Sequence, residues 1–305
     1  MQLRQALNAA VQRLTAAGVP SPRMNAELLM MFTLDCDRAY LYAHPEQLLT
    51  PDETQRYDEA LARRSSGVPA QYITGHQEFW GLDLIVSPAV LIPRPETEHV
   101  VEGVLELVSS GGLKQHQDLE QRAETPVLHK LRIVDVGTGS GAIALALATE
   151  LRSAEIHATE ISAAALEIAR ANAARLDISS RIEFHRTDLL RGLPAEYFDF
   201  VVSNPPYVGE SEEDSVQLEV RKFEPRDAVF AGPTGLEIID RLIPQAENAL
   251  KPRGWLIFEI SGTIAERVLS KLTAWTDVRL TNDLQGIPRV AIARKRQAKS
   301  MTRQV

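Results

Sequence analysis

Hydrophobic positions change their spacing along the chain, and each spacing predicts a different element. In the first 66 residues or so, apolar side chains recur every three to four positions, as from Leu3 to Leu14, which predicts amphipathic helices. Ser21-Pro22 marks the start of a second helix, and Thr50 with Glu53 forms a capping-box pattern before another, with proline suited to the first turn. This segment predicts a small helical bundle that carries no recognisable chemistry.

The pattern becomes irregular after Tyr72. Residues 78–86 alternate like a strand or hairpin. Pro93 and Pro95 exclude a helix over the following segment, since proline removes a donor and restricts the residue before it. Helical spacing returns over 100–108, and residues 109–130 are polar and contain glycine, which predicts a solvated loop.

From residue 131 onward, apolar strands alternate with amphipathic helices. The predicted strands are Arg132–Val136, Glu155–Thr159, Arg181–Arg186, Phe198–Ser203 and Trp255–Ile260, with short late strands at Val278–Leu280 and Arg289–Ala293. The predicted helices are Ala142–Glu150, Ser162–Leu176, Gly235–Leu250 and Ile264–Ala274. Such alternation predicts an α/β fold with a mostly parallel, seven-stranded sheet between helices. We expect a helical domain over 1–70, a hairpin and linker over 71–98, and an α/β domain over 99–305.

Composition narrows the class of protein. Of the 305 residues, 44% are hydrophobic and 24% charged, and the formal net charge is −8. This charge argues against a surface that coats nucleic acid. Cys36 is the single cysteine, so no intrachain disulfide can form, and no apolar run reaches the ~18 residues of a membrane span. We expect a cytoplasmic protein without a membrane segment.

A glycine-rich loop supplies the first candidate site. Asp135 and the residues Gly137, Thr138, Gly139, Ser140 and Gly141 lie between a predicted strand and a predicted helix. Glycine lets the backbone approach a ligand, and the helix start offers free N–H groups. The Gly-x-Gly-x-Gly spacing differs from the pyrophosphate pattern Gly-x-Gly-x-x-Gly, which favours a nucleoside ligand without a pyrophosphate.

Two acids follow the next two strands. Glu160 is placed to accept from ribose hydroxyls, although an acid that starts the helix after it is a competing interpretation. Asp188, with the Leu189 backbone beside it, can accept from an adenine amino group at the carboxyl ends of the strands. Asp188 as a loop cap is equally compatible with the sequence.

Asn204-Pro205-Pro206-Tyr207 directly follows the fourth strand and is the most specific pattern in the chain. The prolines remove two donors and fix the backbone, so carbonyl oxygens are presented rigidly. Asn204 adds a further acceptor and Tyr207 an aromatic face. This pocket suits a planar –NH2, such as a carboxamide or an adenine amino group.

Metal chemistry has no support in the sequence pattern. There is no His-Glu-x-x-His and no Cys/His cluster, so a catalytic zinc site is not expected. The seven histidines, His76, His157 and His185 among them, are scattered along the chain and are interpreted as structural.

The glycine loop and Asn204–Tyr207 together resemble the Rossmann-like S-adenosylmethionine-dependent methyltransferases. Three further segments make the chain similar to the peptide-chain release factor glutamine methyltransferase family over nearly its whole length. They are Phe79-Trp80-Gly81 through Leu91–Glu98, Glu224-Pro225-Arg226-Asp227-Ala228-Val229, and Gly235-Leu236-Glu237.

The resemblance implies a residue assignment. Gly137 to Gly141 would hold the methionine end of S-adenosylmethionine, Glu160 the ribose (where the family more often has Asp), and Asp188 with Leu189 the adenine. Asn204, Pro205, Pro206 and Tyr207 would hold the substrate glutamine, with Asn204 also beside the cofactor. The product would be S-adenosylhomocysteine, and the partners would be release factors. Because the helical domain carries no site residue, we expect it to dock these partners. No direct nucleic-acid contact is expected, and a monomer is favoured.

Other readings stay open at this point. A sister family methylates a glutamine of a large-subunit ribosomal protein, and DNA adenine-N6 methylation also acts on a planar nitrogen. A binding module without turnover is a third alternative.

For Phe79 and Trp80, packing in the core is favoured over a role as a wall of the glutamine pocket. Arg94 suits a salt bridge or a substrate carbonyl, and Glu96 and Glu98 suit a helix start.

Overall fold

The computed structural model describes residues 1–110 and 130–297, so most of the predicted 109–130 loop lies outside the described residues. The chain divides into two compact units, which we describe separately. The N-terminal unit comprises Met1–His76, Val86–Pro88 and Val216–Glu224. The second unit comprises Gln77–Ile85, Ala89–Ser215 and Pro225–Val305.

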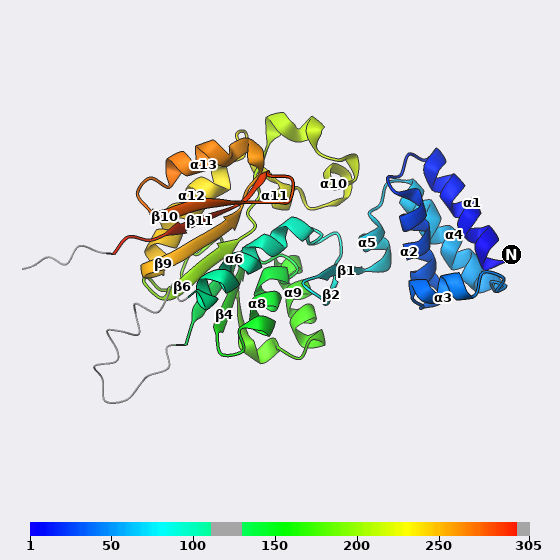
Figure 1. Cartoon of the computed structure of the whole chain (residues 1–305), viewed down its shortest axis with the longest axis horizontal. Coiled ribbons are helices and arrows are strands. Elements are labelled where there is room, and N and C mark those ends of the chain that lie inside the picture. Colours follow the sequence, from blue (N-terminus) through cyan, green and yellow to red (C-terminus); the bar gives the residue numbers. More distant parts are fainter. Residues whose placement is uncertain (111–129, 298–305) are drawn as a thin grey trace, which may run out of the picture. The chain divides into compact units, whose positions relative to one another are not determined.

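The N-terminal unit is a helical bundle, as the sequence predicts (Figure 1). Its helices are α1 (Leu3–Ala16), α2 (Pro22–Leu34), α3 (Arg38–Ala43), α4 (Pro51–Ser65), α5 (Ala70–Thr74) and α10 (Leu218–Phe223). The predicted capping box forms: the Thr50 hydroxyl accepts from the Glu53 N–H at 3.2 Å, and the Glu53 carboxylate accepts from the Thr50 N–H at 2.8 Å. These bonds satisfy two donors that the first turn leaves free.

The buried Arg64 attaches a distant segment to this bundle. Its guanidinium donates to Asn25 Oδ1 at 2.7 Å and pairs with Glu219 Oε2 at 2.9 Å. Because Glu219 lies in α10, the segment Val216–Glu224 packs with helices that precede it by about 150 residues. Phe223 lies beside Gly67 in the same unit.

A seven-stranded sheet forms the second unit, in the order β10-β11-β9-β6-β3-β4-β5. The strands are β3 (Arg132–Val136), β4 (Glu155–Glu160), β5 (Ile182–Arg186), β6 (Phe198–Ser203), β9 (Leu250–Glu259), β10 (Thr276–Asn282) and β11 (Pro288–Arg294). Strand β11 runs antiparallel to both of its neighbours, and all other pairs are parallel. The predicted fold class is confirmed.

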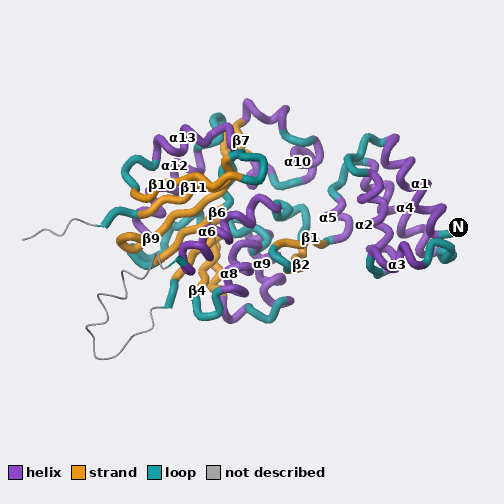
Figure 2. The backbone as a smooth tube through the Cα atoms, viewed as in Figure 1, coloured by secondary structure: helices purple, strands orange, loops and turns teal. Residues whose placement is uncertain are grey.

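Helices cover both faces of the sheet (Figures 1 and 2). One face packs against α6 (Glu98–Ser109), α8 (Ala142–Glu150) and α9 (Ala163–Arg175), and the other against α12 (Glu237–Ala249) and α13 (Ala265–Lys271). Successive residues of β3 serve the two cores, with Ile133 on the α8 side and Val134 on the α12 side. This two-sided burial explains why the strands read as continuous apolar runs.

A hairpin, β1 (His76–Phe79) and β2 (Leu82–Ile85), precedes the sheet, as predicted. Asn172 of α9 fixes its end: its side chain accepts from the Ile85 N–H at 2.7 Å and donates to the Ile85 carbonyl at 3.0 Å. The same amide donates to the Ser140 carbonyl at 2.9 Å. One buried side chain therefore ties the hairpin to the glycine loop.

The segment between β6 and α12 contains short elements that the sequence pattern does not predict. They are β7 (Val208–Gly209), η3 (Glu210–Ser215), α11 (Arg226–Val229) and β8 (Phe230–Gly232). Strands β7 and β8 pair in parallel. The remaining 3-10 turns are η1 (Pro95–Thr97), η2 (Ser179–Arg181) and η4 (Gly262–Ile264). Within 1–110 and 130–297, no helix is long and apolar enough to cross a membrane.

Candidate functional site

Polar side chains stand at the carboxyl ends of five neighbouring strands. In sheet order from β9 to β5 they are Glu259, Asn204, Asp135, Glu160 and Asp188. The carboxyl ends of parallel strands are where an open α/β sheet binds its ligands. Residues spread over 125 positions of the sequence therefore lie in one row, at the end of the sheet where the parallel strands finish.

The glycine loop is held by the neighbouring strand. The N–H groups of Gly137 and Thr138 both donate to the Thr159 carbonyl at 2.9 Å, and Gly141 is the N-cap residue directly before α8. At Gly137 and Gly139 φ is positive (+71° and +55°), and an added Cβ would meet no atom closer than 4.0 Å. The loop is therefore left-handed where glycine is needed, with open space on its outer side.

Glu160 bridges the loop and the next helix. Its carboxylate accepts from the Gly139 N–H at 3.0 Å and from the Ser162 N–H at 2.9 Å. The helix-start interpretation therefore describes part of its role. Each oxygen keeps a further lone-pair direction, so the same carboxylate can also accept from a ligand hydroxyl.

Asp135 is a buried acid that faces the loop from β3. Its Oδ2 accepts from the Thr138 hydroxyl at 2.6 Å and the Ala144 N–H at 3.2 Å, while buried Oδ1 has no hydrogen-bond partner among the described residues. Burial raises the pKa of Asp135 to about 7, against the lowering effect of these two donors. An unpaired buried acceptor of this kind is suited to a ligand donor.

Replacing Asp135 by asparagine is expected to flatten the pH dependence of stability. The folded-state pKa of about 7 lies above the ordinary 3.8, so the folded protein holds a proton that the unfolded chain releases. The free energy of unfolding therefore falls as pH rises through this window. Urea midpoints of both proteins at several pH values between about 4 and 8 test this, and parallel profiles would contradict it.

Asp188 forms an ion pair with Arg241 of α12, and its side chain is 38% exposed. The Asp188 side chain therefore links the end of β5 to α12 through this ion pair, and within the described part of the chain the structure shows no capping bond from it to the loop backbone. Leu189 beside it has a positive φ of +51°, and its N–H has no hydrogen-bond partner among the described residues. A strained residue with a free donor is compatible with a ligand-binding position.

In the Asn204–Tyr207 segment, Asn204 Nδ2 donates to the Thr97 hydroxyl at 3.0 Å. Asn204 Oδ1 and the Pro205 carbonyl accept nothing from the residues that the structure describes. The turn is tightly enclosed, because a Cβ at Gly235 would lie 2.5 Å from the Tyr207 carbonyl. Only glycine allows that approach.

Glu259 is the residue that sequence reasoning missed. Its buried carboxylate accepts from the Thr97 hydroxyl at 2.5 Å and from the Tyr207 hydroxyl at 2.9 Å. Burial raises the pKa of Glu259, and the two hydroxyl donors oppose that rise. The signal available in the sequence was an acid at the end of an apolar strand, Phe258-Glu259-Ile260.

The chain of bonds through Glu259 fixes which way Asn204 faces. An amide nitrogen only donates, so the Thr97 hydroxyl accepts from Asn204 Nδ2 and gives its own proton to Glu259 Oε2. The amide nitrogen of Asn204 is thereby engaged, and its carbonyl oxygen remains as the free end. Tyr207 turns its hydroxyl to the same carboxylate, and burial together with Glu259 raises the Tyr207 pKa.

The aromatic and charged residues before α6 have structural contacts. Phe79 is fully buried in the core on the α8 side, and Trp80 donates its indole N–H to Glu150 at 2.9 Å. The favoured core interpretation is confirmed for Phe79. Glu98 accepts from the Trp80 N–H at 2.8 Å, Glu96 lies in the turn Pro95–Thr97, and Arg94 is half-buried just before that turn.

Comparison with known proteins identifies the class. Residues 5–75 match the family model of the PrmC N-terminal domain, and residues 116–222 match that of the methyltransferase small domain. A solved structure, the hMettl16 catalytic domain in complex with MAT2A 3′UTR hairpin 1, aligns with a TM-score of 0.52 at 20% identity, over 81% of each chain. At this identity the likeness concerns the fold alone. The class is thus a Rossmann-like methyltransferase.

Full-length relatives define the family. The release factor glutamine methyltransferase of Koribacter versatilis is 52% identical over 97% of this chain and 99% of its own. That of Moorella thermoacetica is 39% identical over 97% of this chain and 100% of its own. The chain belongs to the release factor glutamine methyltransferase family.

Proposed function

We propose that this protein transfers a methyl group from S-adenosylmethionine to the side-chain amide nitrogen, N5, of the glutamine in the Gly-Gly-Gln motif of peptide-chain release factors. The observation that carries the proposal is the orientation of Asn204, whose free carbonyl lies next in sequence to the free carbonyl of Pro205. Two acceptors at one turn suit the two hydrogens of a carboxamide nitrogen. Because release factors act in translation, we also propose that the enzyme works in the cytoplasm.

The residues at the strand ends fit the cofactor. The open space beside Gly137 and Gly139 would take its methionine end, together with Thr138, Ser140 and Gly141 of the same loop. The unpaired Oδ1 of Asp135 leaves an acceptor beside this loop. Glu160 would accept from the ribose hydroxyls, and Asp188 with the free Leu189 N–H would meet the adenine edge.

The bound cofactor supplies a methyl group activated by a sulfonium, so the protein's task is to present the nucleophile. An amide nitrogen shares its lone pair with its carbonyl. Acceptors at Asn204 and Pro205 hold its hydrogens and stabilise the positive charge that develops as nitrogen attacks. Positioning of this kind contributes roughly 7–11 kcal/mol in favourable systems. When the nitrogen has taken the methyl group that the cofactor would supply, it would release its extra proton to water.

The same acceptors select glutamine over glutamate. A carboxylate would place anionic oxygen against carbonyl oxygens and leave buried polar groups unpaired, at about 1–3 kcal/mol each. The rigid Pro205-Pro206 backbone cannot turn an N–H toward such a ligand, because proline has none.

Mass spectrometry of a release factor after incubation with the enzyme and S-adenosylmethionine tests the function. A gain of one methyl group on the Gly-Gly-Gln glutamine is expected, and none on a factor in which that glutamine is replaced by alanine. Parallel reactions with ribosomal protein and with DNA test the two alternatives. Methylation of either of them in place of the release factor would overturn the proposal.

We also propose that the N-terminal helical segment, residues 1–70, docks the release factor. Its helices expose large apolar side chains at Met24, Phe32 and Tyr42, which are 56%, 49% and 59% exposed. Exposed apolar groups of this size on neighbouring helices α2 and α3 are suited to a protein partner.

The double substitution of Met24 and Phe32 by alanine is expected to raise the KM for the release factor about tenfold, because two apolar contacts are lost. The dissociation constant of the cofactor should not change. Leu269→Ala on α13, where the leucine is 38% exposed, is the matched control. An equal change in KM for the control and the double variant would refute the docking role.

A further inference from the structure

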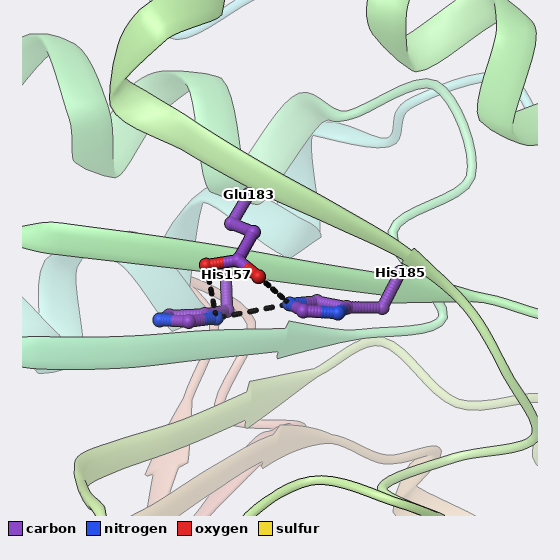
Figure 3. Close-up of side chains that lie close together, drawn as sticks. All are labelled: His157, Glu183 and His185. Atoms are coloured by element: carbon purple, nitrogen blue, oxygen red, sulfur yellow. Dashed lines mark hydrogen bonds and ion pairs between the residues drawn. The ribbon is translucent and has the colours of Figure 1, made fainter.

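Away from the row of site residues, three side chains with metal-binding atoms meet on one face of the sheet. His157 of β4 and Glu183 and His185 of β5 come together as shown in Figure 3. Pairing of the two strands places His157 opposite Glu183, and the period-two alternation of a strand puts His185 on the same face as Glu183. The two histidines are 28 positions apart in the sequence, so only the pairing of the two strands brings them together.

Two ring nitrogens and the two carboxylate oxygens of Glu183 lie at distances from one another that suit a small cation. His157 Nδ1 lies 3.0 Å from His185 Nε2 and 3.7 Å from Glu183 Oε2, and His185 Nε2 lies 3.5 Å from Glu183 Oε1. Tetrahedral zinc with bonds of ~2.0–2.1 Å separates its ligand atoms by roughly 3.3 Å. The three distances, of which the two to Glu183 end on different oxygens, bracket that value.

The ring of His157, the more buried of the two histidines, is oriented by Glu155 on the side away from the other two ligands. Its Nε2 lies 3.0 Å from Glu155 Oε1, which also accepts from the Tyr197 hydroxyl at 2.6 Å. Since an ionised carboxylate only accepts, the proton of neutral His157 sits on Nε2 and the lone pair on Nδ1, toward His185 and Glu183. A carboxylate behind a histidine is the usual support of a metal ligand.

Exposure and charge also suit an ion arriving from solvent. The His157, His185 and Glu183 side chains are 7%, 24% and 66% exposed. His157 therefore lies at the buried end of the site, and His185 and Glu183 form its exposed rim. The nearby cations Lys130 and Arg132 lie 3.9 and 3.7 Å from Glu155 Oε2. Their positive charges offset the negative charge of Glu155. The Glu183 carboxylate then supplies the negative charge that partly neutralises a bound cation.

We propose that His157, His185 and Glu183 form a zinc site that fastens the edge strand β5 to β4. Two imidazoles and one carboxylate suit zinc better than calcium or magnesium, which prefer oxygen ligands. A water would complete the coordination. Strand β5 leads directly to Asp188 and Leu189, so the ion would stiffen the strand that carries the adenine-side residues while taking no part in methyl transfer.

Zinc titration of the full chain, without a histidine tag, against a chromophoric chelator tests the site. One ion per chain is expected. Glu183→Gln should weaken zinc binding at least tenfold and His185→Ala at least 100-fold, because both remove a ligand at the exposed rim. His44→Ala, a histidine of the N-terminal unit, should leave it unchanged. Cobalt in place of zinc should show the visible bands of tetrahedral coordination, and His185→Ala should abolish them.

Thermal unfolding gives a second readout. Zinc at about 100 times its dissociation constant should raise the midpoint of the parent protein by about 5 °C and that of His185→Ala by much less. Absence of stoichiometric binding would overturn the proposal. So would binding that falls equally in His44→Ala and His185→Ala, since it would then be adventitious.

Discussion

Asn204→Ala is expected to lower the rate of methyl transfer by about 10²- to 10³-fold, while the dissociation constant of S-adenosylmethionine changes little. The substitution removes an acceptor that acts on the charge developing at the substrate nitrogen, and the loss of one preorganised group of this kind has an effect of that size. Single-turnover kinetics with saturating cofactor measure the rate, and calorimetry measures cofactor binding. Unchanged turnover would exclude Asn204 from the reaction.

Two further variants separate contact from orientation. Thr97→Val keeps the Asn204 carbonyl but removes the hydroxyl that holds its amide at 3.0 Å, so a smaller loss of about tenfold is expected. Glu259→Gln replaces a carboxylate that accepts from two hydroxyl groups with an amide that also donates. The rate of methyl transfer should therefore fall about as much as in Thr97→Val. If both variants matched the parent rate, the hydrogen-bond chain would have no orienting role.

Glu160→Ala is expected to weaken cofactor binding by about 100-fold. Two ribose hydroxyls would lose a charged acceptor, at about 1.5 kcal/mol or more each. The rate at saturating cofactor should fall far less, because Glu160 is assigned to binding and not to the reacting nitrogen. Calorimetry with S-adenosylhomocysteine provides the measurement.

Glu160→Asp is the matched control for that loss. It keeps the carboxylate and shortens its reach by one methylene, so most of the affinity should return. Glu160 also accepts from the Gly139 and Ser162 N–H groups, and circular dichroism of both variants checks that the loop's surroundings remain folded. Equal affinity of Glu160→Ala and the parent would remove the ribose assignment.

Where a strand is a short apolar run between polar or glycine-rich neighbours, the sequence predicted it to the residue. The strands Arg132–Val136 and Phe198–Ser203 are examples. The helix Ala142–Glu150, which follows the glycine loop, was also predicted to the residue. Strand β9 begins at Leu250, five residues before its predicted start at Trp255. Pro252 and Gly254 conceal its first half, since both residues argue against a strand when read locally.

The candidate site was predictable only in part. Strand ends and glycine spacing located Glu160, Asp188 and Asn204 because parallel topology brings strand ends together. The partners of Asn204 were not predictable. Thr97 and Glu259 are 162 positions apart in sequence, and their contact depends on how α6 packs against β9. Their roles, and that of every site residue, stay predictions until the variants are measured.

The anchoring of Val216–Glu224 by Arg64 has a practical consequence for dissecting the enzyme. The polypeptide passes between the two units five times, at residues 76, 85, 88, 215 and 224, so no single cut releases either unit whole. A truncation that starts at residue 77 would strip Glu219 of its arginine and Phe223 of its packing beside Gly67. Grafting the helical unit onto another protein would require carrying an internal stretch from the middle of the gene along with its beginning.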